Sequence, residues 1–400
     1  MDARSLIELE SRRAARNYAP LDVVLAKGEG CWVEDVEGRR YLDCLSAYGA
    51  VNQGHCHPRI LKALVEQASR LTLTSRAFRN DRFAPLCRKL GDLLGFDRVL
   101  LMNTGAEAVE TAIKAARKWG YTKKGIPEGR AEILVFEGNF HGRTTTIVGF
   151  SSDPESREGF GPFAPGFTAL PFGDLEAVEA AFAARGPGIA AVLVEPIQGE
   201  AGVILPPDDF LPGIRALCDT HRALLICDEI QSGLGRAGSM AASLGSGVRP
   251  DALTIGKALS GGFYPVSAFL ADEEVMEVFG PGTHGSTYGG NPLASAIAEA
   301  ALDVLVDEDL CGNSRAMGAQ LHEGILALRS PKVAEIRAAG LWIGLDLEPS
   351  AGTARAACEE LARHGVLAKD THGRTIRLAP PLVAGPEEID FALSALSKVL

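Results

Sequence analysis

Short apolar runs, each followed by polar or glycine-rich residues, recur through the middle of the chain. The runs are 99–102, 133–136, 190–194, 224–227 and 252–255. Between them, apolar residues recur at the spacing of amphipathic helices. Strands that are apolar on both faces and alternate with helices predict a largely parallel sheet covered on both sides. We therefore expect an α/β domain whose ligands bind beyond the carboxyl ends of the strands.

The two ends of the chain have different patterns. Near the N-terminus a helical segment ends at Pro20, and short strands follow at 32–36 and 41–43 before an amphipathic helix at 60–71. Beyond about residue 290 the expected helices are 293–306, 314–328 and 352–364, with short strands near 341–347 and 375–378. We expect three parts: an N-terminal segment that packs with the small domain, a large domain and a smaller C-terminal α+β domain, over residues 1–48, 49–290 and 291–400.

Composition and charge narrow the class of protein. Hydrophobic residues make up 46% of the 400 residues and charged residues 23%, which is typical of a globular protein. The net charge of −11 argues against nucleic acid or an anionic membrane as the main partner. No signal sequence or membrane span is evident, and the eight cysteines are scattered. We expect a cytoplasmic protein.

Several familiar site patterns are weak or absent. His55 and His57 flank Cys56, but without a second ligand pair this is weak evidence for zinc, and a loop before Pro58 is the simpler interpretation. The residues around Lys257 do not form a nucleotide P-loop, and no G-x-S-x-G motif occurs. We expect no metal site.

Lys257 follows the apolar run 252–255, with glycines on both sides. Desolvation at the end of a buried strand disfavours the ammonium form, so the amine can attack a carbonyl. Schiff-base chemistry needs a lysine in that state. From its position alone, Lys257 is more simply interpreted as a solvated lysine at a strand end. Residues at the ends of the other strands provide the evidence for a catalytic lysine.

Those strand ends supply the groups that pyridoxal 5′-phosphate requires. The turn at Gly105 opens a helix whose first N–H groups suit a phosphate. Asp228 follows a buried strand without an obvious local cation, so a protonated pyridine nitrogen would be a suitable partner. Phe140 could stack on a flat ring, and Arg143 suits a carboxylate. Each has an ordinary structural explanation, but together with Lys257 they indicate this cofactor.

Longer motifs along the chain resemble those of the class III, fold-type I aminotransferases, in order from about residue 18 to the C-terminus. They are 48–58, 71–78, 102–108, 195–200, 227–231, 256–262 and 284–292. The resemblance implies a mostly parallel seven-stranded sheet sandwiched by helices, with a smaller α+β domain. It also implies that Lys257 binds the cofactor covalently and moves a proton, and that Asp228 keeps the pyridine nitrogen protonated. Gln231 would bond the 3′-oxygen, and Phe140 would stack on the ring.

The phosphate residues carry an implication for assembly. By the same resemblance, Gly105 and Ala106 would donate N–H groups to the phosphate. Ser286 and Thr287 would reach that phosphate from the neighbouring subunit. The resemblance therefore implies a homodimer or a dimer-based oligomer with shared active sites.

Within this class the motifs are most similar to those of members that use ornithine. The implied ping-pong reaction transfers the terminal amine of L-ornithine to 2-oxoglutarate, giving glutamate and glutamate 5-semialdehyde, which cyclises to pyrroline-5-carboxylate. Tyr18 and Arg143 would hold the distal head of ornithine, and Tyr48 would narrow the pocket. Arg377 would pair with Glu200 in the ornithine half-reaction and bind the α-carboxylate of glutamate or 2-oxoglutarate in the other. The simpler alternative is a permanent structural bridge between them.

One residue departs from the ornithine pattern. His141 follows Phe140, where some ornithine-using members have tryptophan, and histidine also occurs in members that use acetylornithine or 4-aminobutyrate. The alternatives are therefore acetylornithine or another ω-amino acid as donor. A catalytically idle binding protein and a carbon–nitrogen isomerase on the same fold are further alternatives.

Overall fold

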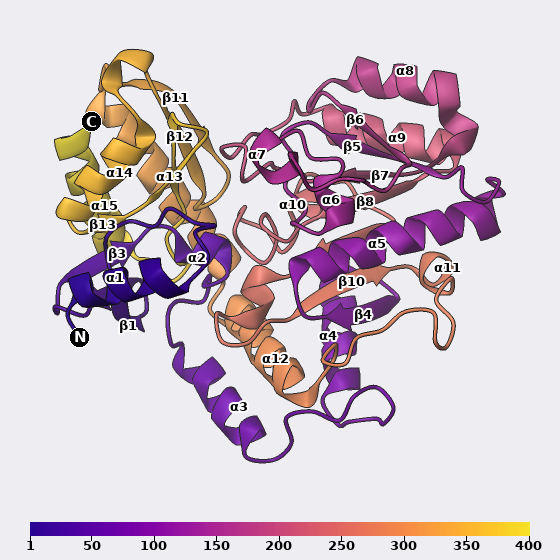
Figure 1. Ribbon diagram of the computed structural model, residues 1–400, viewed down its shortest axis with the longest axis horizontal. Helices are drawn as coiled ribbons and strands as arrows, with labels where there is room; N and C mark the ends of the chain where they lie inside the picture. The colour runs from indigo at the N-terminus through magenta and orange to yellow at the C-terminus, as the bar shows by residue number, and fades with distance from the viewer.

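The computed structural model describes all 400 residues, which form three sheets with helices around them (Figure 1). The central sheet has seven strands in the order β4-β10-β9-β8-β7-β5-β6. Their bounds are β4 Arg98–Met102, β5 Glu132–Phe136, β6 Phe167–Leu170, β7 Ile189–Val194, β8 Leu224–Asp228, β9 Ala252–Ile255 and β10 Ser267–Ala271. Strand β10 is antiparallel to both β4 and β9, and the other pairs are parallel. The expected seven-stranded, mostly parallel sheet is confirmed.

Alternation along the strands divides the interior into two cores, one on each face of this sheet. Ile133 and Val135 of β5 pack in the core that contains α5, whereas Leu134 and Phe136 pack in the core on the opposite face. Successive side chains of a strand point to opposite faces, so strands covered by helices on both sides must be apolar throughout.

The helices of this part of the chain are α3 Pro58–Ala68, α4 Phe83–Leu94, α5 Gly105–Trp119, α6 Thr145–Val148, α7 Pro154–Arg157, α8 Leu175–Arg185, α9 Phe210–His221, α10 Ala242–Gly245, α11 Glu273–Met276 and α12 Pro292–Asp307.

There are two smaller sheets, and one of them joins the two ends of the chain. One has the order β1-β2-β3-β13 and the other β11-β12-β15-β14. Strand β13 runs parallel to β3, so a C-terminal strand extends the N-terminal sheet. Figure 1 shows this arrangement as indigo strands beside yellow elements. The bounds are β1 Leu25–Glu29, β2 Trp32–Asp35, β3 Arg40–Asp43, β11 Val333–Ala338, β12 Ile343–Leu347, β13 Val366–Leu367, β14 Lys369–Thr371 and β15 Thr375–Leu378, with α13 Leu310–Leu328, α14 Ala354–Arg363 and α15 Pro386–Val399.

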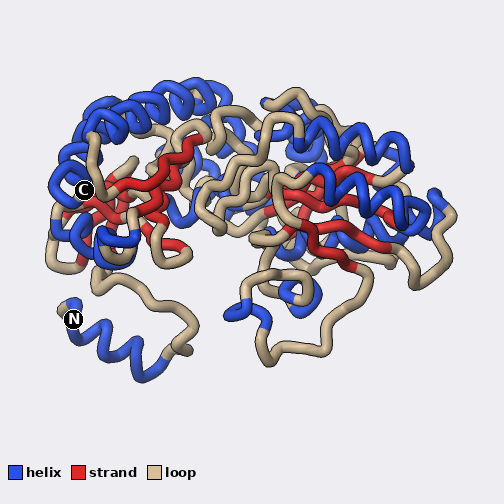
Figure 2. Tube along the Cα trace, turned by 90° about the horizontal axis from the view of Figure 1, so that it is seen from above, coloured by secondary structure: helices blue, strands red, loops and turns tan.

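The N-terminal helix α1 (Ala3–Arg13) has no buried residue. In Figure 2 it lies apart from both bodies of strands, connected by an extended segment. No helix of the structure combines the length and the apolar character that crossing a membrane requires.

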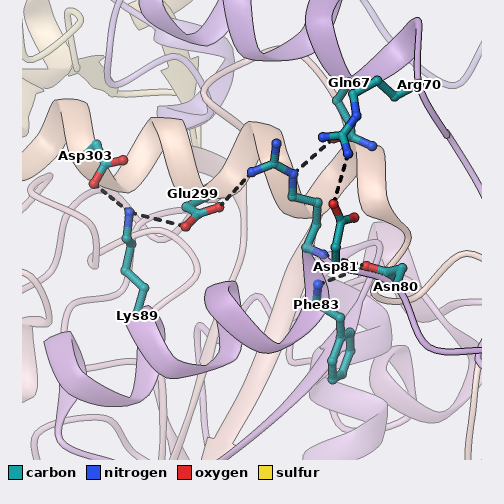
Figure 3. Close-up of polar contacts among 9 residues, drawn as sticks. Gln67, Arg70, Asn80, Asp81, Phe83, Lys89, Glu299 and Asp303 are labelled. Carbon is teal, nitrogen blue, oxygen red and sulfur yellow. Dashed lines mark hydrogen bonds and ion pairs between the residues drawn. The ribbon is translucent and has the colours of Figure 1, made fainter.

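A polar network joins α3, α4 and α12 (Figure 3). Lys89 contacts Asp303 at 2.6 Å and Glu299 at 3.8 Å, and Arg82 bonds Gln67 at 3.1 Å. Nearby, the side-chain amide of Asn80 donates to the carbonyl of Gly290, while its Oδ1 caps the start of α4. The partly exposed ion pairs contribute little stability individually. The hydrogen bond from Asn80 to Gly290 fixes the segment before α4 beside the glycines that precede α12.

Candidate active site

A cavity of about 200 Å³ lies beyond the carboxyl ends of the parallel strands. Its lining residues come from the N-terminus of α5 and from the segments that follow β5, β7, β8 and β9. They are Gly105, Ala106, Phe140, His141, Gly142, Glu195, Asp228, Ile230, Gln231 and Lys257. The six cofactor-site residues expected on one chain all line this cavity. His141, Gly142, Glu195 and Ile230 were not among the expected site residues.

The N-terminus of α5 lies at one end of the cavity. Thr104 and Glu107 form a capping box, in which the Thr104 hydroxyl accepts from the N–H of Glu107. The first N–H groups of a helix have no partner inside it, so those of Gly105 and Ala106 stay available to an anion at the cavity wall. Gly105 also has to be small, because a Cβ atom there would lie 2.9 Å from Ile230 Cδ1.

Phe140 and Ile230 supply apolar groups to the cavity lining. The backbone N–H of Phe140 donates to Glu195 Oε2 at 2.9 Å, which fixes the segment after β5 against the end of β7. Gly142 has φ +128, and a Cβ atom there would lie 2.9 Å from the Cβ of Ala106. Glycine therefore allows this segment to approach α5 closely.

Asp228, the last residue of β8, is 4% exposed and bonded at both carboxylate oxygens. Oδ1 accepts from the backbone N–H of Ile230 at 3.1 Å and from the Thr254 hydroxyl at 3.0 Å. Oδ2 lies 2.6 Å from Nδ1 of His141. The carboxylate, which has no obvious local cation in the sequence, thus has a partner 87 residues away.

Lys257 begins a short 3-10 helix, Lys257–Ser260, immediately after β9 and Gly256. Its φ of +43 is a left-handed conformation that non-glycine residues rarely adopt, and such conformations are concentrated at functional sites. Burial lowers the pKa of Lys257, against the opposing charges of Glu200 and Asp228. This lowering agrees with the expectation that the end of β9 favours the neutral amine.

Glu195 is a second buried carboxyl group of the cavity. Burial raises the pKa of Glu195 to about 8, and the nearby Asp228 charge acts in the same direction, whereas His141 opposes it. At neutral pH this side chain is therefore largely protonated, which distinguishes it from a carboxylate that pairs with a cation.

Glu200 and Arg377 form an ion pair near this cavity. Nη1 of Arg377, on β15, lies 2.9 Å from Oε1 of Glu200 and also donates to the carbonyl of Gly199 at 3.1 Å. Arg377 is only 3% exposed, and its Nε has no hydrogen-bond partner. Burial alone would raise the pKa of Glu200, but the guanidinium outweighs this effect and lowers it below its ordinary value.

Tyr48 lies under this pair, with the Arg377 guanidinium carbon 5.4 Å from the centre of its ring. It belongs to α2 (Ser46–Gly49), in which Ser46, Ala47 and Tyr48 have φ of 50, 48 and 60. Left-handed residues in succession are costly. The turn is held by two sets of hydrogen bonds. The backbone N–H groups of Leu45 and Ser46 both donate to the side chain of Asp43, and the hydroxyl of Ser46 donates to the carbonyl of Ala379.

The two other expected substrate residues, and the two residues expected to reach the phosphate of a neighbouring subunit, are not brought into this group. Tyr18 is 69% exposed in the segment after α1. Arg143 is exposed, and its guanidinium carbon lies 5.7 Å from the centre of the Phe140 ring. Ser286 accepts from the side-chain amide of Asn103 at 2.8 Å within its own chain, while Thr287 is exposed.

The cavity has donors and acceptors that fit pyridoxal 5′-phosphate. Nε2 of Gln231 is buried without a partner, and an unsatisfied donor of this kind is unfavourable unless a ligand takes its hydrogen bond. The helix N-terminus suits the phosphate, and Asp228 retains one free acceptor position at Oδ2. Phe140 and Ile230 provide apolar contacts for a ring, and Lys257 provides the amine.

The family model for class III aminotransferases matches residues 13–400. The chain belongs to this family. It is 59% identical over 392 residues to an ornithine aminotransferase of Bordetella pertussis, covering 98% of this chain and 94% of that protein.

Solved structures agree with the family. An ornithine aminotransferase from Toxoplasma gondii, described with partial occupancy of pyridoxal phosphate at its active site, superposes with a TM-score of 0.97 at 43% identity, covering 100% of this chain and 94% of that one. An acetylornithine aminotransferase from Elizabethkingia anophelis gives a TM-score of 0.91 at 46% identity, covering 100% of this chain and 99% of that one.

Proposed function

We propose that this protein is a pyridoxal-phosphate-dependent transaminase that moves the δ-amino group of L-ornithine to 2-oxoglutarate. The products are glutamate and glutamate 5-semialdehyde, which cyclises to pyrroline-5-carboxylate. The observation that carries the proposal is the Glu200–Arg377 pair close to the Lys257 cavity, because it offers a guanidinium that can be either covered or free. The ornithine aminotransferases among the relatives support the choice of substrate.

When bound, pyridoxal phosphate draws electrons from the carbon that carries the amino group and so makes its proton removable. Lys257 would hold the cofactor through its amine. Asp228 would hold a proton on the ring nitrogen, and Gln231 Nε2 would donate to the ring oxygen. Gly105 and Ala106 would bind the phosphate through their N–H groups.

Lys257 is also the group that moves the proton. Burial lowers the pKa of Lys257 and so favours its neutral amine, and a neutral Nζ can accept a proton from the reacting carbon and return it. Asp228 would have a different task, since Ile230, Thr254 and His141 hold its carboxylate in place and leave one position of Oδ2 for the ring nitrogen. Lys257 and Asp228 would therefore have separate tasks in the reaction.

The Glu200–Arg377 pair would allow one site to accept two kinds of substrate. The δ-amine end of ornithine has no carboxylate beside the reacting carbon, so Arg377 stays bound to Glu200. Glutamate and 2-oxoglutarate bring an α-carboxylate that replaces Glu200 on the guanidinium. Removing one partner of a buried pair is costly, but exchanging it for a substrate carboxylate avoids that cost. Tyr48 would support the guanidinium in the paired state.

The distal head of ornithine would be held by Tyr18 and Arg143, which are exposed in the single chain. We propose that a homodimer completes the site, with Ser286 and Thr287 serving the phosphate of the neighbouring subunit. The exposure of Thr287 leaves it accessible for such a contact.

N-acetylornithine is the second candidate donor. It is favoured by His141, which also occurs in acetylornithine-using members, and by the similarity to the Elizabethkingia structure. The test is a half-reaction: load the protein with pyridoxal phosphate, omit any oxo acid, and add L-ornithine or N-acetylornithine in parallel. Rapid loss of the yellow absorbance with ornithine alone is expected. If the absorbance is lost only with N-acetylornithine, that compound is the donor and ornithine is not. If the loaded protein has no yellow absorbance at all, it does not bind the cofactor as proposed.

A further inference from the structure

The segment that follows α11 lies along the first turns of α5. His284 is partly buried, and its Nε2 lies 2.8 Å from the hydroxyl of Thr111, which is fully buried. Its Nδ1 lies 2.8 Å from Nζ of Lys114, which also donates to the carbonyl of Thr283 at 3.2 Å. The ring of Phe279 stacks on the imidazole, with ring centres 5.2 Å apart and planes inclined by 29°. The imidazole is therefore held at both nitrogens and on one face.

The hydrogen bonds of this cluster run in one consistent direction. An ammonium group only donates, so Nδ1 of His284 accepts from Lys114. The hydrogen of the neutral ring then lies on Nε2 and is donated to Thr111, whose own hydroxyl donates to the carbonyl of Glu107 at 2.7 Å. Burial and the Lys114 charge lower the pKa of His284, which agrees with a neutral ring. A continuous chain of hydrogen bonds thus ties His284 to the helix.

Two residues further on, the same segment is held at the N-terminus of α5. The hydroxyl of Ser286 accepts from the side-chain amide of Asn103 at 2.8 Å and from the backbone N–H of Gly289 at 3.1 Å. These bonds occupy both acceptor positions of the hydroxyl, so its hydrogen stays available to an acceptor such as a phosphate oxygen. The loop 284–287, which ends at the exposed Thr287, is therefore fixed on α5 at two points.

This loop does not line the site of its own chain. Neither Ser286 nor Thr287 lines the Lys257 cavity or a neighbouring cavity of about 330 Å³, which also reaches Gly105. In a symmetric homodimer, a loop carried by α5 of one copy can meet the N-terminus of α5 of the other copy. The second cavity leaves room beside Gly105 for side chains from such a loop.

We propose that His284 is a positioning residue, which fixes on its own α5 the loop through which Ser286 and Thr287 bind the cofactor phosphate of the neighbouring subunit. A loop that is fixed before binding loses less conformational entropy when it contacts the phosphate. The helix that binds one phosphate at its N-terminus thus also carries the loop for the other site. The inference rests on the proposed cofactor and homodimer, and it concerns affinity for the phosphate, not the chemistry at Lys257.

The matched variants are H284Q and H284M, whose side chains have nearly the same length and shape. The glutamine amide can donate to Thr111 in place of Nε2, whereas methionine cannot. T111V removes the hydroxyl that His284 contacts and retains the shape of threonine. H221M is the control, because His221 also stacks on a phenylalanine, Phe182, with ring centres 4.9 Å apart, and neither residue lines the two cavities.

Each purified variant is measured for its affinity for pyridoxal phosphate, for its affinity for pyridoxal, which lacks the phosphate, and for kcat at saturating cofactor. We expect H284M and T111V to bind pyridoxal phosphate about three- to thirtyfold more weakly, the scale of one hydrogen bond to a neutral or charged acceptor. Pyridoxal affinity and kcat should stay within about twofold of the parent. H284Q should retain most of the parent affinity, and H221M all of it. Because the two changes remove one contact, the double variant should be no weaker than H284M.

Hybrid dimers show in which subunit His284 acts. In the first hybrid, one chain carries both K257A and H284M and the other is the parent, so the single site with Lys257 receives the altered loop. In the second hybrid, one chain carries K257A and the other H284M, so the single site with Lys257 receives the intact loop. The yellow absorbance of the lysine-bound cofactor reports only that site. We expect weaker binding of pyridoxal phosphate in the first hybrid and binding like that of the parent in the second.

The outcomes separate the possible failures. His284 does not position the loop for the neighbouring subunit if H284M binds pyridoxal phosphate as tightly as the parent, if it loses affinity for pyridoxal to the same extent, or if the second hybrid is the weaker one. In each of these cases the proposed reaction stands. If the parent itself does not bind pyridoxal phosphate, the proposed function fails.

Discussion

The cofactor half and the substrate half of the site differ in how much one chain supplies. The six cofactor residues expected on one chain meet in a single cavity at the sheet edge. Of the substrate residues, Glu200, Arg377 and Tyr48 meet, whereas Tyr18 and Arg143 are exposed. Parallel strand ends fix groups that perform one constant task. The groups proposed to serve two different substrates lie in exposed segments, in a short turn or in the Glu200–Arg377 ion pair.

The largest effect is expected in the cofactor half, from K257A. Removing the amine should eliminate both the covalent link and the proton transfer, lowering kcat at least about a thousandfold. The measurement is steady-state formation of glutamate from ornithine and 2-oxoglutarate. K118A, on the far end of α5, is a control for loss of a lysine. A K257A protein as active as the parent would refute the mechanism.

The boundary between the two halves can be tested with E200A. Arg377 would lose its partner and bind carboxylates at all times, so the half-reaction with ornithine should slow about tenfold to a hundredfold relative to that with glutamate. D346N is a matched control, because Asp346 pairs with Arg337 at 2.7 Å in the same small sheet, outside the cavity. If E200A leaves the ratio of the ornithine to the glutamate half-reaction rate unchanged, the Glu200–Arg377 pair is a permanent structural bridge.

Smaller effects are expected from the substrate tyrosines. Y48F and Y18F each remove one hydroxyl, and we expect each to reduce the preference for ornithine over 4-aminobutyrate by about three- to tenfold, the scale of one hydrogen bond. The measurement is kcat/KM for both donors at fixed 2-oxoglutarate. If both variants keep the parent preference, neither residue selects ornithine.

The smallest effect concerns stability of the cofactor-free protein. Because the pKa of Glu195 rises to about 8 on folding, the native state keeps a proton that the unfolded chain releases above about 4.5. Stability from this group is thus greatest at low pH and is lost as the pH rises from about 4.5 towards 8. Urea unfolding of the parent and E195Q should diverge by about 1 kcal/mol or more across this window, since a tenfold change in proton affinity corresponds to about 1.4 kcal/mol. Parallel pH profiles of the two proteins would contradict this assignment.

Much of the central sheet could be predicted, because strands covered on both faces are continuous apolar runs. β5, β7, β8 and β9 agree with the expected runs within about one residue. β6 and β10 were not predicted. Residues 167–170 are only partly buried at the sheet edge, and only the short 3-10 helix 257–260 and a brief turn separate β9 from the run 266–271. The pattern of alternating strands and helices does not signal an antiparallel insertion of this kind.

The candidate site was predictable where a residue type and a strand end coincide, as at Asp228 and Lys257. The partner of Asp228 was not, because His141 is distant in sequence and its ring orientation depends on packing against Phe150. Ile230 could have been predicted to line the cavity, because it lies two residues after Asp228. Its side chain is also the reason that residue 105 must be glycine, since a Cβ atom there would lie 2.9 Å from Ile230 Cδ1. Glu195 directly follows the run 190–194, so its place at a strand end could have been predicted, whereas its burial depends on three-dimensional packing.

The most direct test of the proposed reaction follows the nitrogen atom itself. L-ornithine labelled with ¹⁵N at either the δ- or the α-position is incubated with the loaded protein, 2-oxoglutarate is then added, and glutamate is analysed by mass spectrometry. We predict ¹⁵N-glutamate from δ-labelled ornithine and unlabelled glutamate from the α-labelled substrate. Label that arrives from the α-position, or from neither position, would contradict a δ-aminotransferase.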